Sequence, residues 1–277
     1  MKTARCLFPA ILAFIWLAST ARAGEPEKAV FDPPLGSAKI LLSENFETTP
    51  VGEIPKGFTK NGAVGVVDDV AHSGKHSLRM EAATNGARRI TLKGDVVTAL
   101  GGEHWGRLYF KVKMPAPLPN DPTKQFAVIH STLVAGSAQS PQFKDPIEVR
   151  VLDTMIQSNG MMEYIYNVQP KKRPEFANGS GWKYKYTDEW TLAEWHVDSA
   201  TQTYRLYING EEIKGASFSK GAGNFEKAEI PAVFESLSFG WNNYQKADPG
   251  FVAWIDDIAL SKERIGNRGI NDAGKRQ

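Results

Sequence analysis

The stretch Gly106–Lys113, GRLYFKVK, alternates strictly between apolar and polar side chains. Leu108, Phe110 and Val112 fall on one face of an extended chain, and the polar residues between them fall on the other. A period of two is typical of a β-strand with one buried face, because successive side chains of a strand point to opposite sides of the sheet. This segment therefore predicts a half-buried strand.

The same alternation recurs before and after this stretch. It is found in Ile147–Leu152 (IEVRVL), Ser236–Trp241 and Val252–Leu260, and in Tyr204–Asn209 (YRLYIN), which runs into the hairpin-turn signal Asn209-Gly210. No stretch of about a dozen residues carries a convincing helical stripe. With frequent turn residues and seven tryptophans, the chain is predicted to be all-β, a two-sheet sandwich or jelly roll. One sheet of such a sandwich is often concave and can hold a chain-like ligand against aromatic rings.

The first 23 residues have the pattern of an export signal. Lys2 and Arg5 form a positive start, Leu7–Ala18 is an apolar run too short for an ordinary membrane span, and a small-x-small site ends at Ala23. We therefore predict a signal peptide over 1–23 and a mature protein that is secreted or periplasmic. An uncleaved membrane anchor is the alternative.

The remainder divides by composition into three parts. Residues 24–39 are rich in Pro, Gly and charge and are predicted to be a mobile leader. Residues 40–266 are predicted to form one β-jelly-roll domain. Residues 267–277 lack apolar periodicity and are predicted to be a flexible tail.

Charge and cysteine content exclude several classes of protein. The chain of 277 residues has 33 Lys and Arg against 31 Asp and Glu, a formal charge of +2. Loss of residues 1–23, which carry three cations and no acid, lowers this charge to −1. Such a balance argues against a nucleic-acid binder or a polybasic membrane binder. The single cysteine, Cys6, lies in the signal segment, which excludes disulfide scaffolds, thiolate zinc sites and cysteine nucleophiles in the mature chain.

Seven short segments, in the same order, resemble those of a known family. They are Glu44–Glu47 (ENFE), Ala71–Leu78 (AHSGKHSL), His130–Leu133 (HSTL), Glu194–His196 (EWH), Phe239–Tyr244 (FGWNNY), Trp254–Ile258 (WIDDI) and Glu263–Gly266 (ERIG). The chain is similar in these segments to the family of the fungal cellulose-induced secreted protein, whose relatives include glucuronan lyases and many bacterial exported proteins. The resemblance implies a concanavalin-like β-jelly roll of two antiparallel sheets and a polysaccharide as partner. We expect a monomer.

The resemblance also implies a structural calcium ion that ties the first strand to the last. The matching positions are Glu47, Ser73 and Asp256. Their carboxylate and hydroxyl oxygens suit a hard cation that accepts ligands from distant loops. Asp257 follows at once and on a regular strand would point to the opposite face, so only one of the two aspartates is expected to be a ligand. The alternative is that the aspartates cap a turn and Glu47 is solvated.

A lyase that cleaves uronic-acid chains needs a group that neutralises the sugar carboxylate, a base and a proton donor. Arg150 is the candidate neutraliser, because its planar fork matches a carboxylate. His130 matches a histidine of the family and is the candidate base. Tyr244 matches a family tyrosine and is the candidate proton carrier, with Tyr166 as second choice.

The chain departs from the family pattern beside Arg150. Glu148 stands where the family member has histidine, and Thr154 stands where it has glutamine. Glu148 could cancel the charge of Arg150 or form a plain ion pair with it. Glu148 and Asp153 have opposite parity and are expected on opposite faces, which argues against a paired-acid glycosidase.

Aromatic residues offer a binding alternative without catalysis. Trp182 and Tyr184 share a parity and, with Trp241, are candidate sugar-stacking rings. Two functional hypotheses follow: a polysaccharide lyase acting by β-elimination, and a non-catalytic carbohydrate-binding jelly roll. A surface-adhesion domain is a third, less favoured alternative.

Overall fold

The computed structural model describes residues 40–120, 127–140, 143–171, 175–221 and 230–266. The predicted signal peptide, leader and C-terminal tail lie outside the described residues. All the described residues belong to one compact unit.

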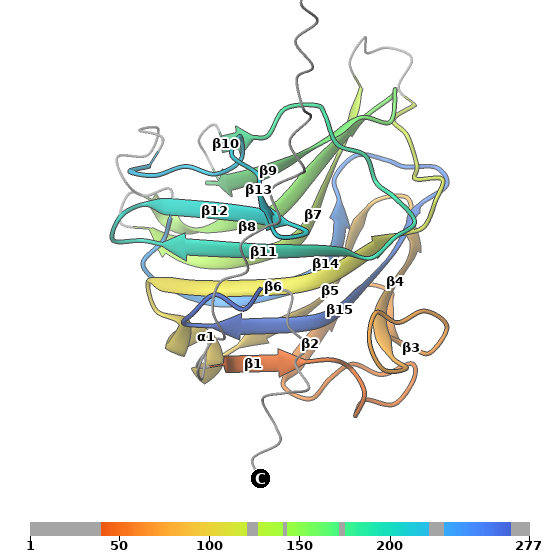
Figure 1. Ribbon diagram of the computed structural model, residues 1–277, viewed down its shortest axis with the longest axis horizontal. Coiled ribbons are helices and arrows are strands. Elements are labelled where there is room, and N and C mark those ends of the chain that lie inside the picture. The colour runs from red at the N-terminus through yellow and green to blue at the C-terminus, as the bar shows by residue number, and fades with distance from the viewer. Residues whose placement is uncertain (1–39, 121–126, 141–142, 172–174, 222–229, 267–277) are drawn as a thin grey trace, which may run out of the picture. The chain divides into compact units, whose positions relative to one another are not determined.

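Fifteen strands and one short helix make up the regular secondary structure of the described residues (Figure 1). The elements are β1 (Ile40–Glu44), β2 (Phe58–Asn61), β3 (Val64–Val67), β4 (Ser77–Ala83), β5 (Gly86–Lys93), α1 (Asp95–Leu100), β6 (Glu103–Val112), β7 (Val128–Ser140), β8 (Phe143–Gln157), β9 (Met162–Gln169), β10 (Phe176–Gly179), β11 (Thr191–Asp198), β12 (Thr203–Ile208), β13 (Glu211–Glu212), β14 (Phe234–Asn243) and β15 (Phe251–Ser261).

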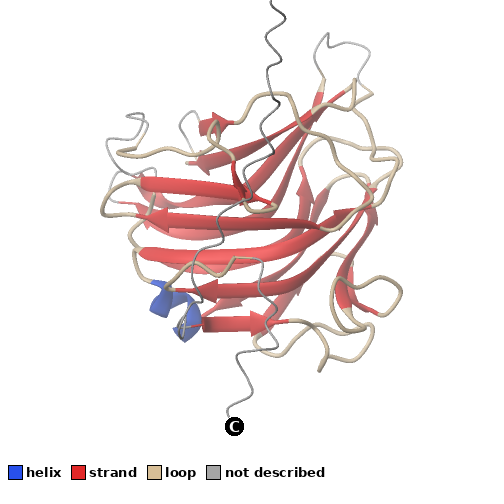
Figure 2. Ribbon diagram, viewed as in Figure 1, coloured by secondary structure: helices blue, strands red, loops and turns tan. Residues whose placement is uncertain are grey.

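The strands form two antiparallel sheets stacked face to face (Figure 2). The eight-stranded sheet has the order β13-β12-β11-β6-β15-β4-β3, with β1 also paired to β15. The seven-stranded sheet has the order β10-β9-β8-β7-β14-β5-β2. Neighbouring strands are often far apart in sequence, as expected for a jelly roll. The predicted fold class, an all-β sandwich of two antiparallel sheets, is confirmed.

The apolar faces predicted from alternation form the core between the sheets. Leu108, Phe110 and Val112 of β6 are at most 3% exposed. A hydrogen bond also joins the two layers, since the Tyr204 hydroxyl of β12 donates to the Val151 carbonyl of β8 at 2.5 Å. Fully burying an aliphatic side chain stabilises a fold by about 1.5–3 kcal/mol, so this layer of strand residues is the main source of stability.

β-bulges interrupt the alternation in the middle of the seven-stranded sheet. Between Arg150 and Asp153 strand β8 advances three residues while its partner β9 advances two. Strand β7 shows register shifts against β8 between Thr132 and Ala135. A bulge adds one residue to one strand and re-aims the side chains that follow, and bulges are frequent beside active sites.

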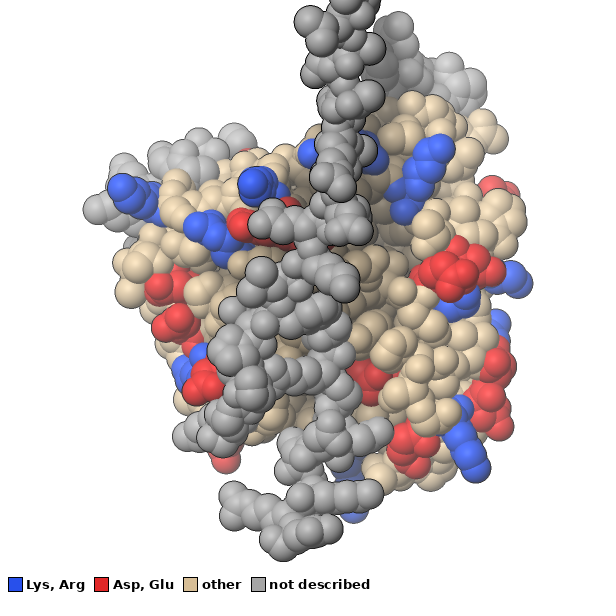
Figure 3. Space-filling model, in the orientation of Figure 1, with Lys and Arg blue, Asp and Glu red and all other residues tan. Residues whose placement is uncertain are grey.

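Cationic and anionic side chains are interspersed on the face turned to the viewer in Figure 3. This mixture accords with the near-neutral formal charge. Within the described residues, no helix is long and apolar enough to cross a membrane.

Candidate functional site

His130, Arg150 and Tyr244 come together on the outward face of the seven-stranded sheet. They belong to β7, to β8 and to the residue that follows β14. The Arg150 guanidinium carbon lies 4.0 Å from the centre of the Tyr244 ring, and Arg150 Nη1 lies 3.5 Å from His130 Nδ1. The Tyr244 backbone N–H donates to the His130 carbonyl at 3.0 Å, which fixes the two residues beside each other. The structure thus brings together three residues that are far apart in sequence.

Asp153, which was not among the candidates predicted from the sequence, contacts His130 and fixes its ring. Its carboxylate contacts His130 Nε2 and accepts a hydrogen bond from the Thr132 hydroxyl at 2.8 Å. Asp153 is completely buried. The expectation that Asp153 and Glu148 lie on opposite faces is wrong, because the β8 bulge places Asp153 on the same side as Arg150 although the two are three residues apart.

Glu148 completes a closed loop of polar contacts. Its Oε1 accepts a hydrogen bond from Arg150 Nε at 2.9 Å and another from the Tyr244 hydroxyl at 3.0 Å. The Tyr244 hydroxyl also lies 3.1 Å from the Thr132 hydroxyl. The ion pair between Glu148 and Arg150, one of the two sequence-based alternatives, is therefore present. The Arg150 side chain is only 7% exposed.

The electrostatics favour a charged arginine and a protonated tyrosine. Burial lowers the pKa of Arg150, but Asp153, Tyr244 and Glu148 together outweigh it and leave this pKa raised. Burial, followed by the negative charge of Glu148, raises the pKa of Tyr244 to about 12. At neutral pH the Tyr244 hydroxyl is a proton donor.

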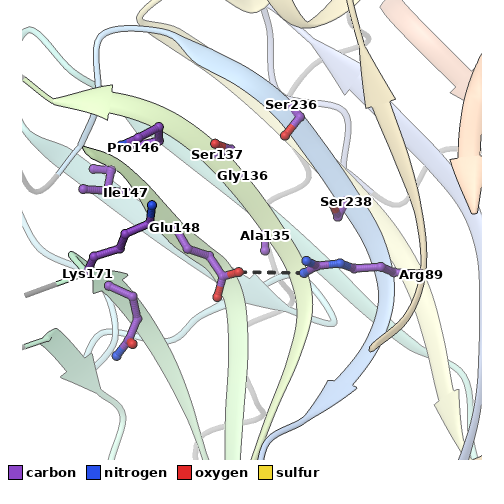
Figure 4. Close-up of a pocket in the computed structure, with 11 residues that line it drawn as sticks. Arg89, Ala135, Gly136, Ser137, Pro146, Ile147, Glu148, Lys171, Ser236 and Ser238 are labelled. Carbon is purple, nitrogen blue, oxygen red and sulfur yellow. Dashed lines mark ion pairs between the residues drawn. The ribbon is translucent and has the colours of Figure 1, made fainter. Parts of the chain in front are cut away.

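A pocket of about 300 Å³ lies next to this group on the same sheet face (Figure 4). Its floor consists of small residues of β7 and β14, namely Ala135, Gly136, Ser137, Ser236 and Ser238. Arg89, Glu148 and Lys171 stand around the floor, and Glu148 lies between the two cations in Figure 4. Arg89 Nη1 is 3.9 Å from Glu148 Oε2. The two oxygens of Glu148 thus face the His130 group and the pocket respectively.

Two predicted site residues lie in the core instead. Trp241 is 1% exposed and packs between Tyr186 and Phe251, with ring centres at 5.9 and 5.0 Å. Tyr166 is fully buried against Tyr204, at 4.5 Å. Because both rings point between the sheets, Trp241 as a sugar-binding residue and Tyr166 as a proton carrier are wrong.

The other two candidate rings differ in exposure. Trp182 is 36% exposed and is available for contact. Tyr184 is half-buried, packs edge-on against Tyr164 at 5.1 Å and forms a β-bridge with Met162. Tyr184 therefore offers only part of its ring. No aromatic residue occurs among the pocket-lining residues that the structure describes.

The predicted calcium positions gather around one loop, residues 72–76. Glu47 Oε1 accepts backbone N–H bonds from Lys75 at 2.8 Å and His76 at 2.7 Å. Asp256 Oδ2 accepts backbone N–H bonds from His72 at 2.9 Å and Ser73 at 3.2 Å. The loop between β3 and β4 is therefore tied to both the segment after β1 and the middle of β15.

Both aspartates of the WIDDI segment reach this loop, which corrects the expectation of opposite faces. The Ser73 hydroxyl donates to Asp257 Oδ1 at 2.8 Å. Asp257 has a positive φ of 49° and β15 shifts register after Asp256, so the alternation is interrupted here. Burial, followed by the charge of Asp257, raises the pKa of Asp256 to about 7.

The donor chemistry of this region fits Ca²⁺, which takes carboxylate, hydroxyl and carbonyl oxygens. A cation would also compensate the charge of the buried Asp256. In the described part of the chain, no group of three or more His, Cys, Asp and Glu side chains is placed to hold a metal. The predicted set would therefore depend on two acids together with the Ser73 hydroxyl.

Comparison with known proteins gives a likeness of fold. No family model and no curated protein matches the chain. Among solved structures it is similar to "Cellulose induced protein, Cip1", with a TM-score of 0.50 and 18% identity over 82% of this chain and 100% of that chain. It is also similar to the binding domain of botulinum neurotoxin DC in a complex with SialylT, with a TM-score of 0.50 and 12% identity over 84% of this chain and 50% of that chain. A third structure concerns botulinum neurotoxin type C, whose cell entry depends on two ganglioside molecules; its TM-score is 0.50 and its identity 12%, again over 84% and 50%.

At these identities the likeness establishes the fold alone. Fold and site together define the class of molecule: a two-sheet jelly roll with a polar pocket and a buried His–Asp pair on the outward face of one sheet.

Proposed function

We propose that this chain is an exported carbohydrate-active protein that binds a uronic-acid-containing polysaccharide over the seven-stranded sheet and cleaves it by β-elimination. The observation that carries the proposal is the meeting of His130, Arg150 and Tyr244 in one polar group beside a pocket. A base, a cation and a proton donor are the three groups that this reaction needs. The likeness of fold to the structure that concerns botulinum neurotoxin type C, whose cell entry depends on two ganglioside molecules, supports a glycan partner by analogy.

The proton steps follow from the hydrogen bonds. With Nε2 turned to Asp153, the Nδ1 lone pair of His130 takes the proton on the carbon beside the sugar carboxylate. The electrons of that C–H bond form the new C=C bond, and the glycosidic C–O bond breaks at the neighbouring carbon. The Tyr244 hydroxyl gives its proton to the leaving oxygen. Arg150 places positive charge near the developing enolate, and Asp153 keeps the His130 ring in its tautomer.

The test is a search for the unsaturated product, which absorbs in the ultraviolet, on a panel of uronans. His130→Ala and Tyr244→Phe are expected to lower the rate by about 10²–10⁴-fold. Asp153→Asn is expected to lower kcat while leaving KM nearly unchanged, because Asp153 positions His130 and does not touch the sugar. A wild-type chain that yields no unsaturated product from any uronan would rule out the lyase.

A non-catalytic carbohydrate-binding module is the second candidate. The observation that favours it is the state of Arg150, whose charge is already engaged by Glu148 and whose side chain is largely buried. Retention on a polysaccharide column with no product, lost on Trp182→Ala, is the result expected for this candidate.

We further propose that Glu47, Ser73 and Asp256 hold a structural Ca²⁺ ion and that the chain acts outside the cytoplasm, as its N-terminal segment predicts. The convergence of these three residues on the 72–76 loop supports the ion. The ion would stabilise the junction of β1, β4 and β15 and take no part in the reaction.

A further inference from the structure

The two arginines on the outward face of the seven-stranded sheet differ in how fully they are paired. Arg150 makes a 2.9 Å hydrogen bond to Glu148, lies over the Tyr244 ring and is 7% exposed. Arg89 is 24% exposed and lies 3.9 Å from Glu148, beyond hydrogen-bond distance. A ligand can therefore reach Arg89 with less rearrangement than Arg150.

Arg89 is placed at a pocket and not on an open surface. Its side chain reaches from β5 toward Glu148 on β8, over the two intervening strands, and lines the 300 Å³ cavity (Figure 4). The floor beneath it is low because β7 and β14 carry only Ala, Gly and Ser there. Lys171 adds a second cation, which is 66% exposed and lies 3.8 Å from the Asp145 carboxylate.

The side chains that line the pocket favour a ligand that carries both a carboxylate and hydroxyl groups. Arginine forms paired hydrogen bonds with a carboxylate, and the serine hydroxyls of the floor can donate to or accept from sugar hydroxyls. Among the described residues that line the pocket, no aromatic ring is available to stack on an apolar sugar face. The volume lies at the lower end of the range for ligand pockets, which suits a single sugar ring.

We infer that this pocket is a subsite for one carboxylated sugar residue and that Arg89, rather than Arg150, binds its carboxylate. Lys171 assists by its charge, and Glu148 is the internal competitor that the sugar carboxylate replaces beside Arg89. Arg150 keeps its proposed place beside the developing enolate and, through its contacts with Glu148 and His130, also holds these two side chains in position. This inference rests on the proposed function and assigns its specificity to a residue that the sequence did not single out.

The experiment measures binding by calorimetry with tetrasaccharides of polyglucuronate and polymannuronate, each compared with its carboxyl-reduced form. The wild-type chain is expected to prefer the carboxylated form of at least one pair. Arg89→Ala is expected to weaken binding of that form about tenfold to a hundredfold and to leave the reduced form nearly unchanged, so the preference disappears.

Two further variants sharpen the test. Glu148→Gln removes the competing charge and is expected to tighten binding of the carboxylated form in the presence of Arg89, but not in the double variant with Arg89→Ala. Arg205→Ala is the control for loss of a partly exposed arginine, because Arg205 lies on the other sheet and is 29% exposed; it pairs with Glu212 at 3.4 Å and also donates hydrogen bonds to the Phe218 carbonyl and the Ser219 hydroxyl. It is expected to leave binding unchanged.

The outcomes separate the two levels of the proposal. A chain that binds no glycan of either form overturns the proposed function and this inference with it. A chain that binds both forms equally, or whose preference survives Arg89→Ala, overturns only the role of Arg89 and leaves glycan binding standing.

Discussion

Two tryptophans illustrate how far a residue's role can be predicted from its neighbours. Trp241 has the same parity as Leu237 and Phe239, which are both buried, and its own burial follows that alternation. Its place in the FGWNNY segment had suggested a ligand-binding ring, but parity was the better guide. Trp182 lies in an irregular segment outside the named strands, where parity has no meaning, and its exposure could not be predicted.

The two residues give a matched prediction. Trp241→Ala removes a ring from between Tyr186 and Phe251 and is expected to lower the free energy of unfolding by about 3–5 kcal/mol. Trp182→Ala removes a ring that is 36% exposed and is expected to lower that free energy by less than the Trp241 variant does. Urea denaturation of both variants measures the difference. Equal losses would contradict the burial of Trp241.

At the scale of strands, the segments that suggested a family turn out to contact one another in pairs. Glu194 of EWH accepts backbone N–H bonds from Ile265 and Gly266 of ERIG at 3.1 and 2.6 Å. Likewise, Glu47 of the ENFE segment accepts a hydrogen bond from the Lys75 backbone N–H, which belongs to segment Ala71–Leu78. In that same segment, Ser73 donates a hydrogen bond to Asp257 of the WIDDI segment. These motifs are therefore ties between strands that are distant in sequence.

Alternation, which depends only on neighbours in the sequence, predicted strands that the structure places in β6, β8, β12, β14 and β15. The positions of the bulges could not be predicted, because they depend on strand pairing. Asp153 was missed for this reason: its parity places it opposite Glu148, and only the extra residue in β8 turns it toward His130. The pocket was missed for the same reason, since its floor joins β7 to β14, about a hundred residues apart in the sequence.

The tie between Asp256 and the 72–76 loop predicts a pH dependence of stability. The pKa of the Asp256 carboxyl in the folded chain, about 7, lies above the ordinary value of 3.8. Protonation of this carboxyl therefore favours the folded state over the unfolded state. In chelator-treated protein this contribution is complete below pH 4 and is lost as the pH rises through 7. Calcium, which binds the ionised carboxylate, is expected to restore stability above pH 7.

Urea denaturation at pH 5 and pH 8, with chelator and with calcium, measures this effect. Asp256→Asn is expected to show a smaller loss between the two pH values and no response to calcium. A calcium response that persists in Asp256→Asn would place the ion elsewhere. If calcium does not change the stability of the wild-type chain, the proposed ion is ruled out, and hydrogen bonds alone connect Glu47 and Asp256 to the 72–76 loop.

On the scale of the whole molecule, the sandwich separates stability from binding. The core lies between the sheets, whereas the pocket and the His130 group lie on the outer face of one sheet. Side chains on that face can therefore change with little effect on the core. The near-neutral charge leaves recognition to local groups such as Arg89 and not to a long-range field.

A glycan that binds the folded chain and not the unfolded chain is expected to stabilise the folded state. A ligand present at about 100 times its Kd adds about 2.7 kcal/mol to the free energy of unfolding. For a protein of this size that corresponds to a rise in Tm of about 5–10 °C. Differential scanning calorimetry of the chain lacking residues 1–23, with carboxylated and carboxyl-reduced oligosaccharides at matched concentrations, measures it. A rise with the carboxylated glycan, absent with the reduced one, is the expected result; an unchanged Tm with every uronan and neutral glucan at millimolar concentration would favour the adhesion domain.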